Sequence, residues 1–289
     1  MKKATVYFTR KCAPESVVML YEKLGSPLQG RIAVKLHSGE KGNQNFLGPS
    51  FFRPIIERTG GRVTECNTAY EGERNSTEKH LRVLREHGWS EAFPVDLMDA
   101  EGPDAVLEIP DGRTIQKNYV GKHLLNYDSM LVLSHFKGHP MGGYGGALKQ
   151  LSIGVASSYG KAYIHGAGKP EEIWTADHDS FLSAMADAAA SVVRHFAGNI
   201  VYINAMMNMS VDCDCCAVAE DPCMKDIGIL ASMDPVAIDR ACLDLVQAST
   251  DPGRDHLMER ILSRNGFHTV DCAEALGIGT QDYELVSVD

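Results

Sequence analysis

Short apolar segments alternate with amphipathic segments along most of this 289-residue chain. Apolar and β-branched runs predict strands, and apolar residues at three- to four-residue spacing predict helices. The predicted strands are Ala4–Thr9, Arg31–Leu36, Arg62–Thr68, Pro94–Met98, Met130–Leu133, Ile200–Ile203, Ile227–Leu230 and Tyr283–Val288. The predicted helices are Pro14–Leu24, Pro49–Thr59, Ser76–Gly88, Asp177–Phe196, Pro235–Gln247 and Arg254–Asn265. This alternation predicts an α/β fold with a mostly parallel, mixed sheet and helices on both faces.

Composition supports a packed core and excludes some classes of function. Apolar residues make up 44% of the chain, which is typical of a globular protein. We expect a single α/β domain over residues 1–289, with two lobes, 1–125 and 126–289, as the alternative. The formal charge of −10, without a basic run, argues against a nucleic-acid partner. No apolar run is long enough for a membrane span, and no secretory signal is visible, so we expect a cytoplasmic protein.

The stretch between residues 130 and 165 gathers most of the groups suited to chemistry. Its predicted strand runs directly into ionisable side chains and then into a glycine-rich segment. Ligands of open α/β sheets bind beyond the carboxyl ends of the strands, and glycines let the backbone approach a ligand closely. The candidate catalytic residues are His139, Lys149 and His165. The candidate cofactor-binding residues are His135, Lys137, Gly142, Gly143, Gly145, Gly146 and Lys161.

Two neighbouring features extend this candidate site. The segment Ala147–Ile153 is apolar at helical spacing, and the amides that open it are expected to suit an anion. A long polar loop follows the predicted strand Arg31–Leu36, which is again a usual place for ligand-binding groups. Its candidate residues, together with the end of that strand, are Lys35, His37, Lys41 and Asn43.

Four of the eight cysteines lie close together and form a second candidate site: Cys213, Cys215, Cys216 and Cys223. In a reducing compartment such a group indicates metal or redox chemistry rather than disulfides. The spacing matches neither paired zinc ligands nor a ferredoxin run, but thiolates on a short loop can bind a soft metal or an iron–sulfur cluster. We therefore expect these cysteines to bind a metal, with His135, His139 or His165 able to complete the ligand shell.

Acidic residues surround these thiols: Asp212, Asp214, Glu220 and Asp221. Their negative charge is expected to raise the thiol pKa values when no metal is bound. A nucleophilic cysteine needs a positive environment instead, so this pattern argues against one.

The chain resembles the family called domain of unknown function 362, whose members are often labelled iron–sulfur centre proteins. The matching stretches are His135–His139, Gly145–Lys149, Ser158–Lys161, His165, Cys213–Cys215 and Asp226–Asp239. The resemblance implies a metal or iron–sulfur cofactor. Longer relatives carry an added ferredoxin-like module with regular cysteine repeats, and this chain lacks such repeats.

A more distant resemblance is to lactate racemase, which uses a nickel-pincer nucleotide. His139, Lys149 and His165 keep the spacing of three functional residues in that family. The resemblance implies that Lys149 carries the cofactor, that His165 binds nickel and that His139 transfers a proton. Leu148 stands where that family has arginine, and the cysteine segment has no counterpart there.

Three functions remain open on this basis. The first is a metal- or iron–sulfur-binding protein with a redox role, for example with a 4Fe–4S cluster, or with zinc or nickel in its place. The second is a racemase-like enzyme in which histidines transfer protons and lysines hold a cofactor or an anionic substrate. The third is a non-catalytic binder of metal or of an anionic ligand. The expected partners are a small anionic substrate or a redox partner, and we also consider a homodimer.

Overall fold

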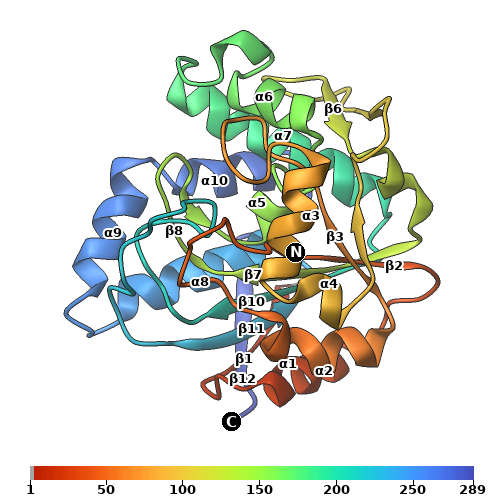
Figure 1. The fold of residues 1–289 in the computed structure, drawn as a ribbon. Helices are drawn as coiled ribbons and strands as arrows, with labels where there is room; N and C mark the ends of the chain where they lie inside the picture. Colours follow the sequence, from red (N-terminus) through yellow and green to blue (C-terminus); the bar gives the residue numbers. More distant parts are fainter. Residues whose placement is uncertain (1–2) are drawn as a thin grey trace.

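An eight-stranded sheet forms the centre of the protein in this computed structural model, which describes residues 3–289 (Figure 1). The strand order is β12-β1-β11-β10-β7-β2-β3-β4. Only β11 runs against the other strands of this sheet, because it is antiparallel to both β10 and β1. The predicted mixed, mostly parallel sheet is therefore confirmed. The strands are β1 (Ala4–Thr9), β2 (Ile32–Lys35), β3 (Arg62–Glu65), β4 (Val95–Leu97), β7 (Ser129–His135), β10 (Ile200–Met206), β11 (Gly228–Ser232) and β12 (Tyr283–Ser287).

Helices connect most of these strands and pack against the sheet (Figure 1). The α-helices are α1 (Pro14–Lys23), α2 (Pro49–Thr59), α3 (Thr77–Glu86), α4 (Trp89–Ala92), α5 (Ala147–Leu151), α6 (Ser158–His165), α7 (His178–His195), α8 (Pro235–Ala248), α9 (Arg254–Ser263) and α10 (Phe267–Ala275). Two short 3₁₀ helices are η1 (Lys122–Asn126) and η2 (Pro170–Glu172). Within residues 3–289, none of the helices combines the length and the apolar character needed to cross a bilayer.

Alternate side chains of the central strand β7 enter two different hydrophobic cores. Met130 and Val132 pack in a core that includes residues of α5, α7, α8 and α10. Leu131 and Leu133 pack in a second core that includes residues of α1, α2, α3 and α4. Because successive side chains of a strand point to opposite faces, the two cores lie on opposite faces of the sheet.

Helix starts follow the capping residues of the sequence. The carboxylate of Asp234 accepts hydrogen bonds from the amides of Val236 and Ala237, so Asp234 caps α8. Asp177 caps α7, the longest helix, in the same way. The short helices α4, α6 and α10 were not predicted, because no long periodic pattern marks them.

Two short strand pairs lie outside the main sheet. The segments that flank Asp111-Gly112, a dipeptide typical of hairpin turns, form the antiparallel pair β5 (Ala105–Glu108) and β6 (Lys117–Val120). The glycine-rich segment, expected as a loop, forms a second pair, β8 (Lys137–His139) and β9 (Gly143–Gly145). Gly143 has φ +77°, and a Cβ there would lie 2.9 Å from the Cα of Gly266, so both conformation and space require glycine.

Candidate functional site

The carboxyl edge of the sheet carries a buried cavity lined by ionisable side chains. Lys35 ends β2, Glu65 ends β3 and His135 ends β7, and all three line the cavity. Parallel strands bring their carboxyl ends to one edge, which explains why residues far apart in sequence meet there. The cavity has a volume of about 50 Å³. One water needs roughly 10–15 Å³ of such space, so there is room for a few waters or one small ligand.

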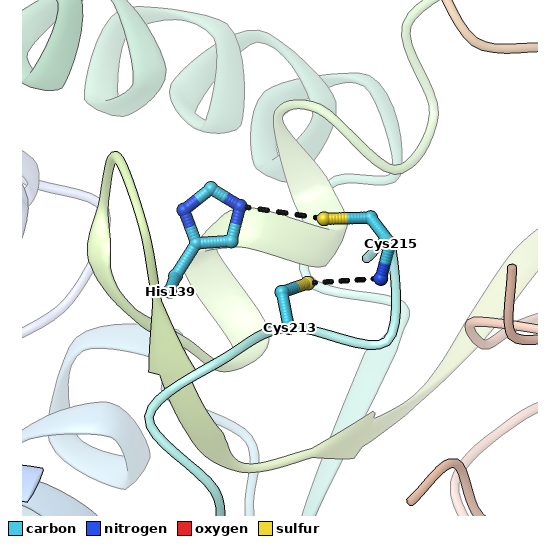
Figure 2. Close-up of side chains that lie close together, drawn as sticks. All are labelled: His139, Cys213 and Cys215. Carbon is cyan, nitrogen blue, oxygen red and sulfur yellow. Dashed lines mark hydrogen bonds between the residues drawn. The ribbon is translucent and has the colours of Figure 1, made fainter. Parts of the chain in front are cut away.

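The cysteine segment follows β10 and turns back towards the hairpin β8–β9. Figure 2 shows His139 beside Cys213 and Cys215. The ring nitrogen Nε2 of His139 lies 3.8 Å from Sγ of Cys215, and Nζ of Lys149 lies 3.4 Å from Sγ of Cys213. The potential ligand atoms of His139, Cys213 and Cys215 all lie within 4.8 Å of one another. The expected meeting of the cysteines with the histidine and the lysine is therefore confirmed.

The other two cysteines of the segment are placed differently. Cys216 is half-buried next to Cys215, and it lies outside the group of three potential ligands. Cys223 donates its thiol hydrogen to the carbonyl of Met209 at 3.3 Å and is also outside that group. The structure thus brings two of the four predicted sulfur ligands next to His139, and of these Cys215 lines the cavity.

The surroundings of Cys213 lower its pKa and favour the thiolate form, which corrects the expectation that its acidic neighbours raise its pKa. Burial alone would raise the pKa, but hydrogen bonding from Cys215 and the positive charges of Lys149 and Lys137 lower it well below its ordinary value. The neighbouring carboxylate of Asp214 is already paired with other cations. The expectation does hold for Cys215, whose pKa is raised by its contact with the Cys213 sulfur.

Asp214 organises the cations at the end of β7. It accepts hydrogen bonds from Nδ1 of His135 at 2.9 Å and from Nζ of Lys137 at 2.7 Å. The other ring nitrogen of His135 faces the carbonyl of Met207 at 2.6 Å. Both ring nitrogens of His135 therefore face partners within the protein, which disfavours this ring as a metal ligand. His135 and Lys137 fix the cysteine segment to the sheet through Asp214.

His139 and His165 adopt opposite tautomers. Nδ1 of His139 accepts the amides of Met141 and Gly142 at 3.1 and 2.8 Å, so the hydrogen of the neutral ring is on Nε2. Nδ1 of His165 instead donates to the carbonyl of Lys161 at 2.7 Å, which leaves a lone pair on Nε2. Burial lowers the pKa of each histidine to about 4, so both rings are neutral at pH 7. One ring offers a hydrogen and the other offers a lone pair.

The glycines and the helix amides serve the site in different ways. Gly145 and Gly146 line the cavity. A Cβ on Gly146 would lie 2.5 Å from Oδ1 of Asp239. That carboxylate accepts the amides of Ala147 and Leu148, so the amides that open α5 bind the chain's own anion and not an external one. This corrects the expected anion site there and shows how α5, which carries Lys149, is held.

The polar loop after β2 divides into cavity residues and supporting residues. Lys35 and His37 line the cavity, whereas Lys41 lies at the surface and pairs with Glu86 at 3.4 Å. The side-chain amide of Asn43 donates to the carbonyl of Cys216 at 2.9 Å. The next two side chains continue these contacts with the cysteine segment: Gln44 donates to the carbonyl of Ala219, and Asn45 to that of Glu220. This loop therefore supports the cysteine segment.

Three further residues of the site, which the sequence patterns did not single out, come from the end of β3 or from the polar stretch after it. Glu65 forms a buried ion pair with Lys35, with Nζ and Oε2 2.6 Å apart. Arg74 and Tyr70 also line the cavity, and both belong to the polar stretch after β3. Polar residues at or just beyond the end of a strand, the same signal that marked the segment after Met130–Leu133, could have identified them.

Comparison with known proteins places the chain in a family. The family described as domain of unknown function DUF362 matches residues 32–244. No curated protein matches significantly. The lactate racemase apoprotein from Thermoanaerobacterium thermosaccharolyticum has a similar fold, with a TM-score of 0.54, 13% identity and coverage of 85% of this chain. A structural-genomics protein from Thermotoga maritima has a TM-score of 0.45, with 12% identity and coverage of 91% of this chain.

This chain corresponds to only part of the length of each of the two solved structures. This chain spans 58% of the racemase chain and 59% of the Thermotoga maritima protein. At 13% identity the likeness to the racemase shows a shared fold alone. The family match covers well over half of the sequence and includes β2, β7, β10, β11 and the cysteine segment. The chain therefore belongs to the DUF362 family.

Proposed function

We propose that this protein binds a thiophilic transition-metal ion through Cys213 and Cys215 and acts with it on a small anionic molecule in the same cavity. The observation that carries the proposal is the pair of sulfurs beside His139, of which that of Cys215 belongs to the wall of a cavity rich in lysine. Thiolates select soft metal ions, and hydrogen bonding from Cys215 together with nearby lysines lowers the pKa of Cys213 against the effect of burial, which favours the form that binds metal.

The donor set favours a single ion over a cluster. A 4Fe–4S cluster takes four cysteine ligands, and this arrangement offers two sulfurs in ligand range of each other. Cys223 would have to break its hydrogen bond to Met209 to join them. The hydrogen on Nε2 of His139 also disfavours this ring as a ligand unless it is lost on binding. In the metal-free protein that hydrogen points at the Cys215 sulfur.

Metal analysis of protein purified without oxygen tests the proposal. Excluding oxygen matters because exposed thiolates oxidise readily. We expect about one metal ion per chain without a matching amount of sulfide. Cys213→Ser and Cys215→Ser should each lose most of the metal. Cys223→Ser, the matched control in the same segment, should retain it.

Each alternative outcome has a clear meaning. Iron with an equal amount of acid-labile sulfide would replace the single ion with an iron–sulfur cluster. Metal loss in Cys223→Ser equal to that in Cys213→Ser would show that the segment rearranges to use all of its thiols. A metal-free protein that takes up no nickel, iron or zinc removes the proposal.

A second candidate function is proton transfer at carbon, supported by the complementary tautomers of His139 and His165. The lone pair on Nε2 of His165 suits a base, and the Nε2 hydrogen of His139 can polarise a substrate oxygen. Both rings line the cavity together with Lys149. The fold neighbour named lactate racemase suggests a small hydroxy acid as substrate.

Hydrogen exchange measures this activity directly. The metal-loaded protein, incubated with lactate in D₂O, is expected to incorporate deuterium at the α-carbon, which NMR detects. His165→Gln should slow exchange by about 100-fold or more, the usual contribution of a general base. His195→Gln, on an exposed histidine at the end of α7, should leave the rate unchanged. Equal exchange in the two variants would exclude His165 as the base.

A further inference from the structure

Arg74 is the least expected charged group of the cavity. It follows β3 in the chain, yet its side chain is only 3% exposed. Its Nε donates to Oε2 of Glu40 at 3.1 Å. The carboxylate of Glu65 lies 3.9 Å from its terminal nitrogen, too far for a hydrogen bond.

Most of the Arg74 guanidinium is left without hydrogen bonds. An arginine side chain has five N–H donors in a planar fork. Among residues 3–289, only the Nε donor of Arg74 has a hydrogen-bond acceptor, and the residue lines the cavity. Because the side chain is only 3% exposed and lines the cavity, these donors are best satisfied by an acceptor within the cavity, and a charged acceptor gives the stronger hydrogen bond.

The cavity also carries a surplus of positive charge. Lys35 and Arg74 are each matched by a carboxylate, namely Glu65 and Glu40, and Nζ of Lys149 lies 3.4 Å from Sγ of Cys213. Lys137 and His135 share the single carboxylate of Asp214.

Lys161 has no ion-pair partner among residues 3–289, and its Nζ donates only to the carbonyl of Ala156, at 2.6 Å. It is 6% exposed and lines the same cavity as Arg74. Together with the cations that share Asp214, Lys161 leaves the buried site with more positive than negative groups. A metal ion on the thiolates would increase this surplus.

We propose that the free edge of Arg74, with Lys161, forms a binding site for the carboxylate of a small organic acid. The planar fork of a guanidinium matches the two oxygens of a carboxylate, and the lysine supplies a second charge. The limited volume selects acids of a few carbons. Arg74 also lies close to Tyr70 and Cys215, so the bound acid would lie next to the sulfurs. This inference names the substrate class of the proposed function, and it rests on that function only for the role of the neighbouring metal.

Calorimetric titration with acetate, glycolate and pyruvate tests the site, on both metal-loaded and metal-free protein. We expect saturable binding of at least one of these acids to the wild type. Arg74→Met should weaken binding by about tenfold or more, because a charged hydrogen-bonded pair is lost. Arg74→Lys, which keeps the charge without the fork, should bind with intermediate affinity. Arg85→Met, on the exposed face of α3, is the matched control and should bind like the wild type.

Arg74→Met leaves Glu40 buried and unpaired, which destabilises the folded protein, so a second variant is needed. The double variant Arg74→Met/Glu40→Gln removes both charges of the pair and is expected to fold but not to bind the acid. Binding by this double variant as tight as that of the wild type overturns the proposal, and so does the absence of binding by the wild type. Metal content is measured in parallel. Unchanged metal with lost acid binding supports the carboxylate site, and lost metal with retained acid binding rejects only the proposed metal function.

Discussion

Replacing Glu65 with alanine is expected to lower the free energy of unfolding by about 3–5 kcal/mol, the usual cost of leaving a buried charge without its partner. Lys35 is completely buried, and its Nζ lies 2.6 Å from Oε2 of Glu65. Burial alone would raise the pKa of Glu65, but the charge of Lys35 together with other nearby positive groups, among them Arg74, outweighs this and lowers the pKa well below its ordinary value. Glu65 also accepts hydrogen bonds from the amide and hydroxyl of Ser38, so its loss affects several buried groups.

Urea unfolding followed by circular dichroism measures this change. Glu86→Ala is the matched control, because Glu86 forms a surface pair with Lys41 at 3.4 Å and should cost less than about 1 kcal/mol. The double variant Lys35→Met/Glu65→Gln removes both charges and should recover part of the loss. A Glu65→Ala protein as stable as Glu86→Ala would mean that Lys35 finds another partner or loses its proton.

Mild acid is expected to destabilise the metal-free protein strongly between pH 7 and pH 5. Burial lowers the pKa of His80 to about 3 and that of His139 and His165 to about 4. In the unfolded chain these rings have the ordinary pKa of about 6.5, so the unfolded state binds more protons as the pH falls. The stabilisation is therefore complete above pH 6.5 and is lost as the pH falls towards 4.

The size of this effect follows from the pKa differences. At pH 5, proton binding by the unfolded chain lowers the free energy of unfolding by about 2 kcal/mol for each of the three histidines. Asp239 acts in the opposite sense, because burial raises its pKa to about 6. Its protonation in the folded state raises the free energy of unfolding by about 1 kcal/mol between pH 7 and pH 5. The net loss is on the order of 5 kcal/mol.

Urea unfolding at the two pH values gives the measurement. His80 is the best residue for a variant, because its ring is completely buried outside the proposed ligand group and its Nε2 has no hydrogen-bond partner among residues 3–289. His80→Gln should reduce the difference between pH 7 and pH 5 by about 2 kcal/mol. Equal stability of the wild type at both pH values would contradict the neutral state of these rings.

The site could be predicted where a local pattern has a direct physical meaning. Polar residues immediately after the strand Met130–Leu133 indicated the carboxyl edge of the sheet, and His139, Lys149 and His165 do line a cavity there. The cysteine segment was expected to join them, and Cys213 and Cys215 do so. Cys223 does not, because it bonds to the backbone of its own segment, and spacing in sequence does not reveal such a contact.

Charges were harder to predict than positions. The acidic residues next to Cys213 suggested a raised pKa, but Lys137 and Lys149 lie 76 and 64 positions away in sequence and lower it. Asp214 is adjacent to Cys213, yet its charge is shared with His135 and Lys137. A pKa depends on the groups within a few ångströms, and most of these come from other elements of the fold.

The amino-acid sequence by itself determined the secondary structure of most segments and the α/β class, because apolar periodicity and capping residues act over a few residues. It also supplied the chemical groups of the site. Only the tertiary structure decided which of them meet, because strand order and the burial of Glu65 and Arg74 depend on pairing between distant segments. The tertiary structure also decided which groups carry charge or hydrogen, since Asp214, Met207 and the hairpin amides set the state of His135 and His139.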